Sequence, residues 1–352
     1  MISPASAALG GAITHHPADA RRQVAKLWHP SPIKGEEHRL RLTLPPLTDK
    51  AGPMDIPTPN PEKLVAALVR LLTVEPSGED TFTGQRKQGG IGRVFGGEVI
   101  AQALMAAQAT VDPGRDVHSL HAYFLSGGSE EHPSEYAVSR PFDGGSFCNR
   151  HVVASQQDRA ILTLSASFQK AEQGLEHQHE PMPQVTPPEE LEPEFELRMR
   201  YAEKASPAMR HFFTTPRPIE SRAVEPRHWM HPEVAPPVSH SWIRAVAPLP
   251  DDPALHRAVL AYASDFTLLG TCALPHGLSW SRGEMVSASL DHTVWFHGDF
   301  RADEWLLYAT DSPWTGGGRG FNRGRIYTRD GRLVASVAQE GMIRRRVVAD
   351  KP

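Results

Sequence analysis

The sequence predicts an α+β protein made of two copies of one unit, in which a helix is followed by four antiparallel strands. One observation behind this fold class is the element order, which occurs twice along the 352 residues. Another is a set of local similarities, such as Ser146-Phe147 with Gly320-Phe321, at offsets of 171 to 174 residues. A repeat of this length indicates two fused copies of a domain, not a solenoid of short units.

The first unit begins with a short helix opened by Asn60-Pro61-Glu62, followed by a strand around Thr81–Gly84. Gly96-Gly97 then opens an Ala- and Leu-rich helix that extends to about Thr110. The turns between the later strands carry residues such as Asp143-Gly144-Gly145, which favour turns. This order suggests a helix packed on a curved sheet. The predicted strands after the helix are 117–125, 135–140, 146–155 and 160–170.

The second unit repeats this order. A strand at 241–247 precedes a helix whose start is signalled by Asp252, a capping residue, and by Pro253, which suits the first helical position. Apolar residues recur at helical spacing after it, and Pro275 ends the helix at the latest. The predicted strands that follow are 286–297, 305–311, 320–328 and 333–344.

Asp265 is the unusual residue of this second helix. It lies about three turns in, directly before Phe266 on the apolar stripe. Helix capping does not explain it, because a capping Asp would stand at the helix start. Two interpretations stay open. Asp265 is either a solvated carboxylate on the outer edge of the helix or a carboxylate at the floor of a pocket, where desolvation would raise its pKa.

The segments outside the two units differ in composition. The first 59 residues are rich in Ala, Pro and His, and we expect them to be disordered or loosely attached. Met54 is a candidate for the true translation start, which the intact mass of the native protein would test. A Pro-rich linker with an acidic cluster and one helical patch joins the units. The predicted organisation is extension 1–59, first domain 60–171, linker 172–237, second domain 238–346 and tail 347–352.

Composition excludes several classes of protein. The net charge of −4 gives no basic footprint for nucleic acid. Cys148 and Cys272 form no CxxC pattern and are typical of reduced cysteines in a cytoplasmic protein. No apolar run of the roughly 18 residues of a membrane span is evident, and no secretory signal is present. The short basic run 344–346 is interpreted as a solvated strand end or, alternatively, a contact for a phosphorylated ligand.

We expect no metal site. Four of the five histidines in the linker are candidate metal ligands, but a metal site would need more convergent Cys or carboxylate spacing. Surface histidines are therefore the preferred interpretation, and no cofactor is expected. The four are His177, His179, His228 and His231.

Several motifs in the same order resemble the acyl-CoA thioesterase II family. The resemblance extends from about residue 61 to 345 and is weakest in the linker. In the first half the matching segments are Val94-Phe-Gly-Gly-Glu-Val99, Val117–Leu125 and Asp143-Gly-Gly-Ser-Phe147. In the second half they are Tyr262-Ala-Ser-Asp-Phe266, Ser289–His297, Trp305-Leu-Leu-Tyr308, Arg319-Gly-Phe321 and Val337-Ala-Gln-Glu-Gly341.

The resemblance implies a double hot dog fold, two curved antiparallel sheets each wrapped around a long helix. It also implies hydrolysis of acyl-CoA to a free fatty acid and CoA, with no metal, no cofactor and no covalent intermediate. The catalytic set carried over by motif is Asp265, Ser289 and Gln339. A homo-oligomer is expected on the same basis. The chain departs from the family at Glu98, where relatives often have Gln, and at 126–128, where Ser-Gly-Gly replaces an Arg-Pro-Gly pattern that would help to hold CoA.

The residue types suit this chemistry. Water that attacks a thioester needs a base and donors that hold it in line. Asp265 would be the base, while Ser289 and Gln339 are neutral hydrogen bonders that would orient the water. Strand parity places Ser289 opposite the more apolar face of its strand, so it should face a polar pocket, or the strand is bulged.

Weaker candidates concern substrate binding. Gly96 and Gly97 would let backbone N–H groups approach a developing oxyanion, although helix packing explains two glycines equally well. Arg319 and Arg323, near a glycine-rich turn, are candidates for the phosphates of CoA. That turn lacks the Lys-Ser/Thr of a P-loop.

Other functions were weighed against hydrolysis. A non-catalytic acyl-CoA- or acyl-carrier-binding protein on the same fold has no need of all three catalytic residues. A hot dog enoyl-CoA hydratase would need an Asp/His pattern, and the neighbours Asp291 and His292 should point to opposite faces of a strand. No Gly-x-Ser-x-Gly elbow is present, which argues against a serine hydrolase.

Overall fold

The computed structural model describes residues 60–87, 92–202, 207–228, 231–280 and 282–346. All of these belong to one compact unit, Ile56–Pro352. The predictions made for the N-terminal extension, for Met54 and for the tail concern chain outside the described residues.

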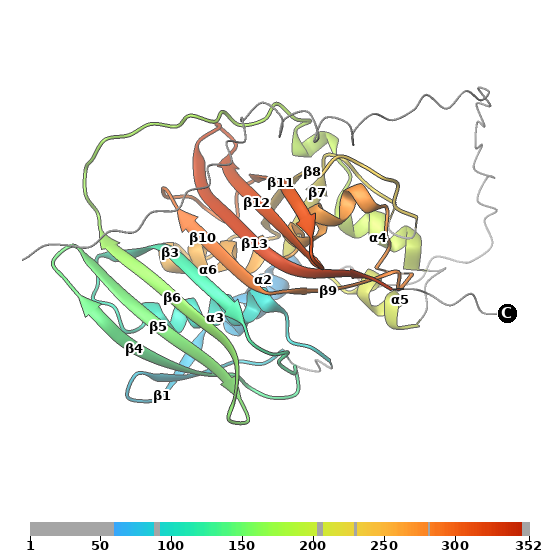
Figure 1. Ribbon diagram of the computed structural model, residues 1–352. Coiled ribbons are helices and arrows are strands. Elements are labelled where there is room, and N and C mark those ends of the chain that lie inside the picture. The colour runs from blue at the N-terminus through green and yellow to red at the C-terminus, as the bar shows by residue number, and fades with distance from the viewer. Residues whose placement is uncertain (1–59, 88–91, 203–206, 229–230, 281, 347–352) are drawn as a thin grey trace, which may run out of the picture. The chain divides into compact units, whose positions relative to one another are not determined.

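The first half contains the predicted helices and strands (Figure 1). Helix α2 begins after Asn60, whose side chain accepts a hydrogen bond from Lys63 N–H at 2.9 Å. Helix α3 is buried on nearly all sides, since ten of its thirteen residues are buried; such a helix belongs in the core. The elements are α2 (Pro61–Leu72), β1 (Val74–Gly78), β2 (Thr81–Gly84), α3 (Gly96–Gln108), β3 (Arg115–Phe124), β4 (Glu135–Asp143), β5 (Phe147–Gln156) and β6 (Arg159–Lys170).

The interval predicted as a linker is partly structured. The predicted helical patch is present, but a second helix follows it, and the chain then adds an edge strand to the sheet of the second half. The elements are a 3-10 turn η1 (Pro188–Glu190), α4 (Glu194–Ala202), α5 (Pro207–Thr214) and β7 (Ile219–Ala223).

The second half has the same plan. Asp252 caps helix α6 as predicted, with its side chain accepting from Ala254 N–H at 3.0 Å, and Pro253 follows as the first helical residue. The elements are β8 (Val238–Ala245), α6 (Pro253–Ser264), a 3-10 segment η2 (Leu268–His276), β9 (Met285–Ser289), β10 (Asp291–Phe296), β11 (Leu306–Gly316), β12 (Arg319–Thr328) and β13 (Leu333–Arg345).

One sheet runs through both halves, and its order shows the duplication. The first half contributes β2-β4-β5-β6-β3, and the second contributes β8-β11-β12-β13-β10 in the corresponding order. The halves join where β3 pairs antiparallel with β10, with Leu120 opposite Val294. Helices α3 and α6 contact each other, and both pack in one hydrophobic core. The duplicated helix-and-sheet unit predicted from the sequence is therefore present.

Helix α6 ends earlier than the apolar pattern predicted. The pattern continues through Phe266 and Leu269, but the α-helix stops at Ser264, and Asp265 is its C-cap with φ −83° and ψ −9°. The chain then turns into the 3-10 segment η2, which contains Pro275 and ends at Gly277 with φ 57°. This ending places the carboxylate beside the start of the other core helix.

The helical stretch Pro253–His276 also corrects one expectation from composition. It is long and apolar enough to pass the length and composition test for a membrane span, with a mean hydropathy of 1.3. In the structure, 61% of its most apolar window is buried. It comprises the core helix α6 of the second half and the 3-10 segment η2 that follows.

The strand predicted at 286–297 is divided. Ser289 pairs with Gly341, whereas Thr293 pairs with Ala338, so the register shifts by one residue at Leu290. The Leu290 N–H donates to the Glu340 carbonyl at 2.9 Å. This irregularity is the bulge that strand parity allowed for, and it sets the directions of Ser289 and His292 independently.

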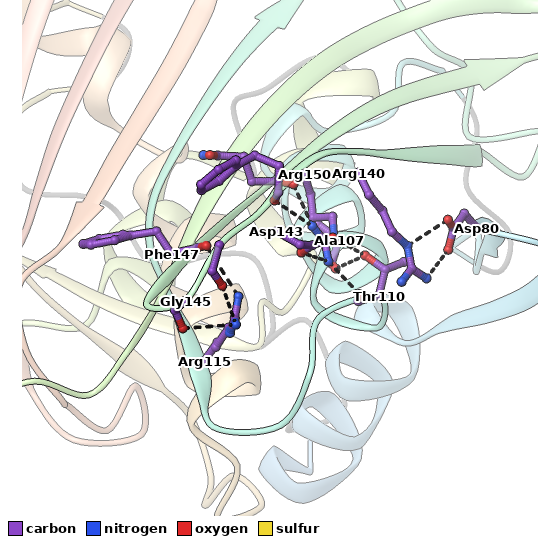
Figure 2. A network of polar contacts seen from close by, with 12 residues as sticks. Asp80, Ala107, Thr110, Arg115, Arg140, Asp143, Gly145, Phe147 and Arg150 are labelled. Carbon is purple, nitrogen blue, oxygen red and sulfur yellow. Dashed lines mark hydrogen bonds and ion pairs between the residues drawn. The ribbon is translucent and has the colours of Figure 1, made fainter.

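The two core helices end differently. At the C-terminus of α3, the buried Arg150 donates to the hydroxyl and the carbonyl of Thr110 at 2.8 and 3.0 Å, and pairs with Asp143 at 2.8 Å (Figure 2). A cation at this end suits the helix dipole. At the equivalent end of α6 the chain carries Asp265 instead, so the two halves are chemically unlike at corresponding places.

Candidate active site

A cavity of about 1770 Å³ is lined by both halves. Its walls come from the end of α2, the start of α3, the end of β3, the segment before β7, η2 and β9. Asp265 and Ser289 line it. Most of the exposed lining is apolar, as expected for a site that holds a long organic ligand.

The three predicted catalytic residues meet at this cavity. Gln339 Nε2 donates to Asp265 Oδ1 at 2.7 Å and to Ser289 Oγ at 3.1 Å. Asp265 comes from the end of α6, Ser289 from the end of β9 and Gln339 from β13. The bulge after Ser289 makes this convergence possible, because it turns the serine toward the cavity while β10 stays paired with β3.

The hydrogen bonds use some of the polar groups of the site and leave others unpaired. Gln339 uses both amide hydrogens as donors, one to each neighbour. The Ser289 oxygen accepts one of them, so its own hydrogen remains available. The Gln339 Oε1 atom is buried without a hydrogen-bond partner among the described residues.

Burial raises the pKa of Asp265 to about 6, while hydrogen bonds from Gln339 and from the Gly97 N–H act in the opposite direction. The Asp265 side chain is only 6% exposed. The structure therefore supports the pocket-floor interpretation over the solvated one. A carboxylate with this pKa is ionised at neutral pH and more basic than an exposed Asp.

Gly96 and Gly97 lie against this carboxylate. A Cβ on Gly96 would stand 2.8 Å from Asp265 Oδ2, and one on Gly97 would stand 2.5 Å from the Tyr262 carbonyl. Both glycines are therefore needed for close packing of α3 on α6. The Gly97 N–H is directed to Asp265.

An aromatic cluster joins the start of α3 to the end of α6. Phe95 stacks on Phe266 with centroids 4.7 Å apart and meets Tyr262 edge-on at 5.2 Å. The three rings also line the cavity, so they give it an apolar wall between the two core helices.

Sequence reasoning missed the position of His292. Its ring is fully buried, with Nε2 at 2.8 Å from Ser264 Oγ. The other nitrogen, Nδ1, has no hydrogen-bond partner in the described part of the chain and lies 3.9 Å from Asp265 Oδ1. Burial lowers the pKa of His292 to about 3, so the ring is neutral beside the carboxylate. Asp291 points elsewhere and accepts from the Glu340 N–H at 2.6 Å.

Glu98 is a second buried carboxyl in the cavity wall. Burial, reinforced by the charge of Glu130, raises its pKa to about 7. The sequence signal was the substitution of Glu for Gln, but nothing local in the sequence shows that this side chain is 5% exposed.

Arg319 and Arg323 lie outside the cavity lining. Arg319 pairs with Glu340 at 3.4 Å, and Arg323 pairs with Asp311 at 2.6 Å. Cations from the first half line the cavity instead. In the described part of the chain, no group of three or more His, Cys, Asp or Glu residues could hold a metal ion.

The duplicated helix-and-sheet unit, with a hydrogen-bonded carboxylate where the two core helices meet, defines a double hot dog protein. Comparison with solved structures agrees. A hot dog fold protein from Alicyclobacillus acidocaldarius has a TM-score of 0.64 at 18% identity, covering 80% of this chain and 99% of that one. At this identity the likeness shows the fold alone.

Closer relatives show the family. A family model described as acyl-CoA thioesterase matches residues 208–342, and one described as acyl-CoA thioesterase N-terminal domain matches residues 85–169. The chain is 40% identical over 282 residues to acyl-coenzyme A thioesterase 8 of Homo sapiens, covering 78% of this chain and 88% of that protein. An acyl-CoA thioesterase II from Mycobacterium marinum has a TM-score of 0.65 at 38% identity, covering 81% of this chain and 100% of that one. The chain belongs to the acyl-CoA thioesterase family and is a thioester hydrolase.

Proposed function

We propose that this protein hydrolyses fatty acyl-CoA to a free fatty acid and CoA, with Asp265 as the general base for a water molecule. The observation that supports this is the Gln339 amide, which ties Asp265 and Ser289 into one group at the cavity wall. A base and its orienting donors within hydrogen-bond reach of one another are what water activation requires.

In this proposal, hydrolysis proceeds through a tetrahedral oxyanion. Asp265 takes one proton from water as the water oxygen bonds to the thioester carbonyl carbon. The carbonyl electrons move onto oxygen to give a tetrahedral oxyanion. The positive end of the α3 dipole, directed at this place by the first turn of the helix, stabilises that charge. Re-forming the carbonyl breaks the C–S bond, and the thiolate takes the proton held by Asp265.

Ser289 and Gln339 have positioning roles in this scheme. Gln339 fixes the carboxylate and the serine oxygen at once, and Ser289 keeps a hydrogen for the water or the substrate carbonyl. Because the base acts through water, no covalent acyl-enzyme forms. The proposed substrate is the thioester of CoA with a fatty acid, which suits a largely apolar cavity.

The test is CoA release from acyl-CoAs of increasing chain length by the wild type and by Asp265→Asn. The variant keeps shape but loses the base, so kcat should fall by roughly 10²–10⁴-fold, with substrate binding retained. Release that persists in the variant would contradict the role of Asp265. Binding without release in the wild type would instead identify an acyl-CoA-binding protein.

A homo-oligomer and a cytoplasmic location stay predictions, and we propose both on the family resemblance. Light scattering of the purified protein tests the first and fractionation of cells tests the second. A monomeric mass across the concentration range would contradict a stable oligomer.

A further inference from the structure

Four cations of the first half stand on the cavity wall. Arg70 lies near the end of α2, Arg86 and Lys87 follow β2, and Arg93 precedes α3. All four are exposed, and none has a carboxylate partner within ion-pair distance among the described residues. Glu75, Glu98 and Glu130 line the same cavity, but the described structure has no ion pair between them and these four cations. Cations that stand on one wall without a close ion pair are suited to an anionic ligand.

A buried glutamine brings three of these cations together. Gln102, which is 1% exposed, donates from Nε2 to the Leu71 carbonyl at 2.5 Å and to the Gln85 carbonyl at 2.7 Å. These two carbonyls belong to the neighbours of Arg70 and Arg86. The Tyr136 hydroxyl donates to Gln102 Oε1 at 2.6 Å and fixes the amide. The C-terminal end of α2 and the segment after β2 are thus clipped to α3.

Arg93 is held by a different device. A Cβ added to Gly127 would stand 2.6 Å from Arg93 Nη2 and 2.7 Å from its Nε. The guanidinium therefore lies directly on the backbone at Gly127, in space that only glycine leaves open. An isolated antiparallel bridge between Arg93 and Ser129 fixes the backbone beside it. Arg93 thus lies against the segment 126–128, where Ser-Gly-Gly replaces the Arg-Pro-Gly pattern of the family.

Three other arginines, two predicted from the sequence to bind phosphate and one on the cavity wall, already have carboxylate partners. Arg319 and Arg323 each pair with a carboxylate outside the cavity. Arg217, on the facing wall, pairs with Glu194 at 3.0 Å. A guanidinium already held by a carboxylate must lose that partner before it binds phosphate.

We propose that Arg70, Arg86, Lys87 and Arg93, here called the cationic rim, bind the phosphates of the CoA nucleotide. The proposal rests on the proposed function, because acyl-CoA supplies a diphosphate bridge and a 3′-phosphate at the end remote from the thioester. Guanidinium groups match phosphate oxygens in pairs, and lysine adds a point charge. The first half then holds the nucleotide, while the second half carries the base.

The test compares two substrates with the same acyl chain, acyl-CoA and acyl-pantetheine, which lacks every phosphate of the nucleotide. The variants are Arg93→Gln and the pair Arg86→Gln with Lys87→Gln. For acyl-CoA, KM should rise by about tenfold in each variant, with kcat nearly unchanged, because phosphate contacts are lost away from the reacting atoms. For acyl-pantetheine, KM should not change.

Arg319→Gln is the matched control, since it removes an exposed arginine outside the cavity, and it should leave both KM values unchanged. The inhibition constant of adenosine 3′,5′-bisphosphate should rise in the rim variants in parallel with KM. An equal rise of KM for both substrates, or no rise for acyl-CoA, would contradict phosphate binding by the cationic rim. Failure of the wild type to release a thiol from either substrate would defeat the proposed function instead, so the two failures are distinguishable.

Discussion

The proposed role of Asp265 as a base depends on the groups that surround its carboxylate. Burial raises its pKa, whereas Gln339 and the Gly97 N–H stabilise the ionised form and limit the rise. The result, about 6, keeps the group ionised at neutral pH and still basic. The neutral ring of His292 completes the enclosure without neutralising the charge.

The pH dependence of kcat/KM should follow this carboxylate. Because only the ionised form accepts a proton, activity should fall as pH decreases through about 6. Gln339→Ala removes a hydrogen bond that lowers the pKa of Asp265, so this acid limb should move to higher pH. The value of kcat should also fall by roughly 10²-fold, since the water is no longer held in line.

A merely structural role for Gln339 would lower kcat without moving the acid limb, and that outcome would contradict its contact with the base. Gln169→Ala provides the control. Gln169 lies on β6, the strand of the first half that corresponds to β13, and is outside the cavity lining. That variant should keep both the rate and the pH profile.

Among the elements, helix α3 is a core helix that also lines the cavity with the buried carboxyl group of Glu98. The helix is buried on nearly all sides, as a core helix should be, but its first turn opens onto the cavity with a carboxyl group. Burial raises the pKa of Glu98 from 4.5 to about 7. Between these pH values the folded chain binds more protons than the unfolded chain, so this group lowers stability as pH rises.

Glu98→Gln should therefore stabilise the protein, and more at pH 8 than at pH 5. The shift in pKa sets an upper limit of about 3 kcal/mol on the gain at the higher pH. Urea denaturation of both proteins at the two pH values measures it. Equal stability of wild type and variant at both values would show that Glu98 is well solvated in the folded state.

The element order could be predicted from the sequence because alternating strands and turn residues are local signals. The end of α6 at Ser264 could not, since the apolar pattern runs on through Leu269. The groups that Asp265 meets there, Gly97 and Gln339, come from distant parts of the chain. The bulge at Leu290 was one of two alternatives that the sequence allowed. Side-chain alternation alone cannot locate a shift in strand register, so the sequence could not decide between them.

For the site, the three catalytic candidates were assigned through a resemblance to a family, and the structure shows that they meet. Glu98 and His292 were missed in these roles because burial is a property of the fold and not of the local sequence. The same limit applies to the residues proposed to bind the phosphates of CoA. Spacing singled out Arg319 and Arg323, but only the fold shows that Arg93 faces the cavity.

Across the whole molecule, the two duplicated halves share one fold but carry different side chains at corresponding places. Opposite charges stand at the corresponding ends of the core helices. Arg150 of β5 lies at the end of α3 as a structural cap (Figure 2). Asp265 stands at the end of α6, where it is the proposed base. The halves stay together through the β3–β10 pairing and the contact between α3 and α6. The cavity lies where these contacts bring the N-terminus of one core helix to the C-terminus of the other.

The most direct test of the account is a single turnover in heavy-oxygen water with enzyme in excess over acyl-CoA. If Asp265 activates water, the fatty acid should carry heavy oxygen from this first turnover, and mass spectrometry of the peptide that contains Asp265 should find none. If the fatty acid is instead unlabelled and heavy oxygen appears in Asp265, the carboxylate attacks the thioester directly. That result would contradict the role of Asp265 as a base.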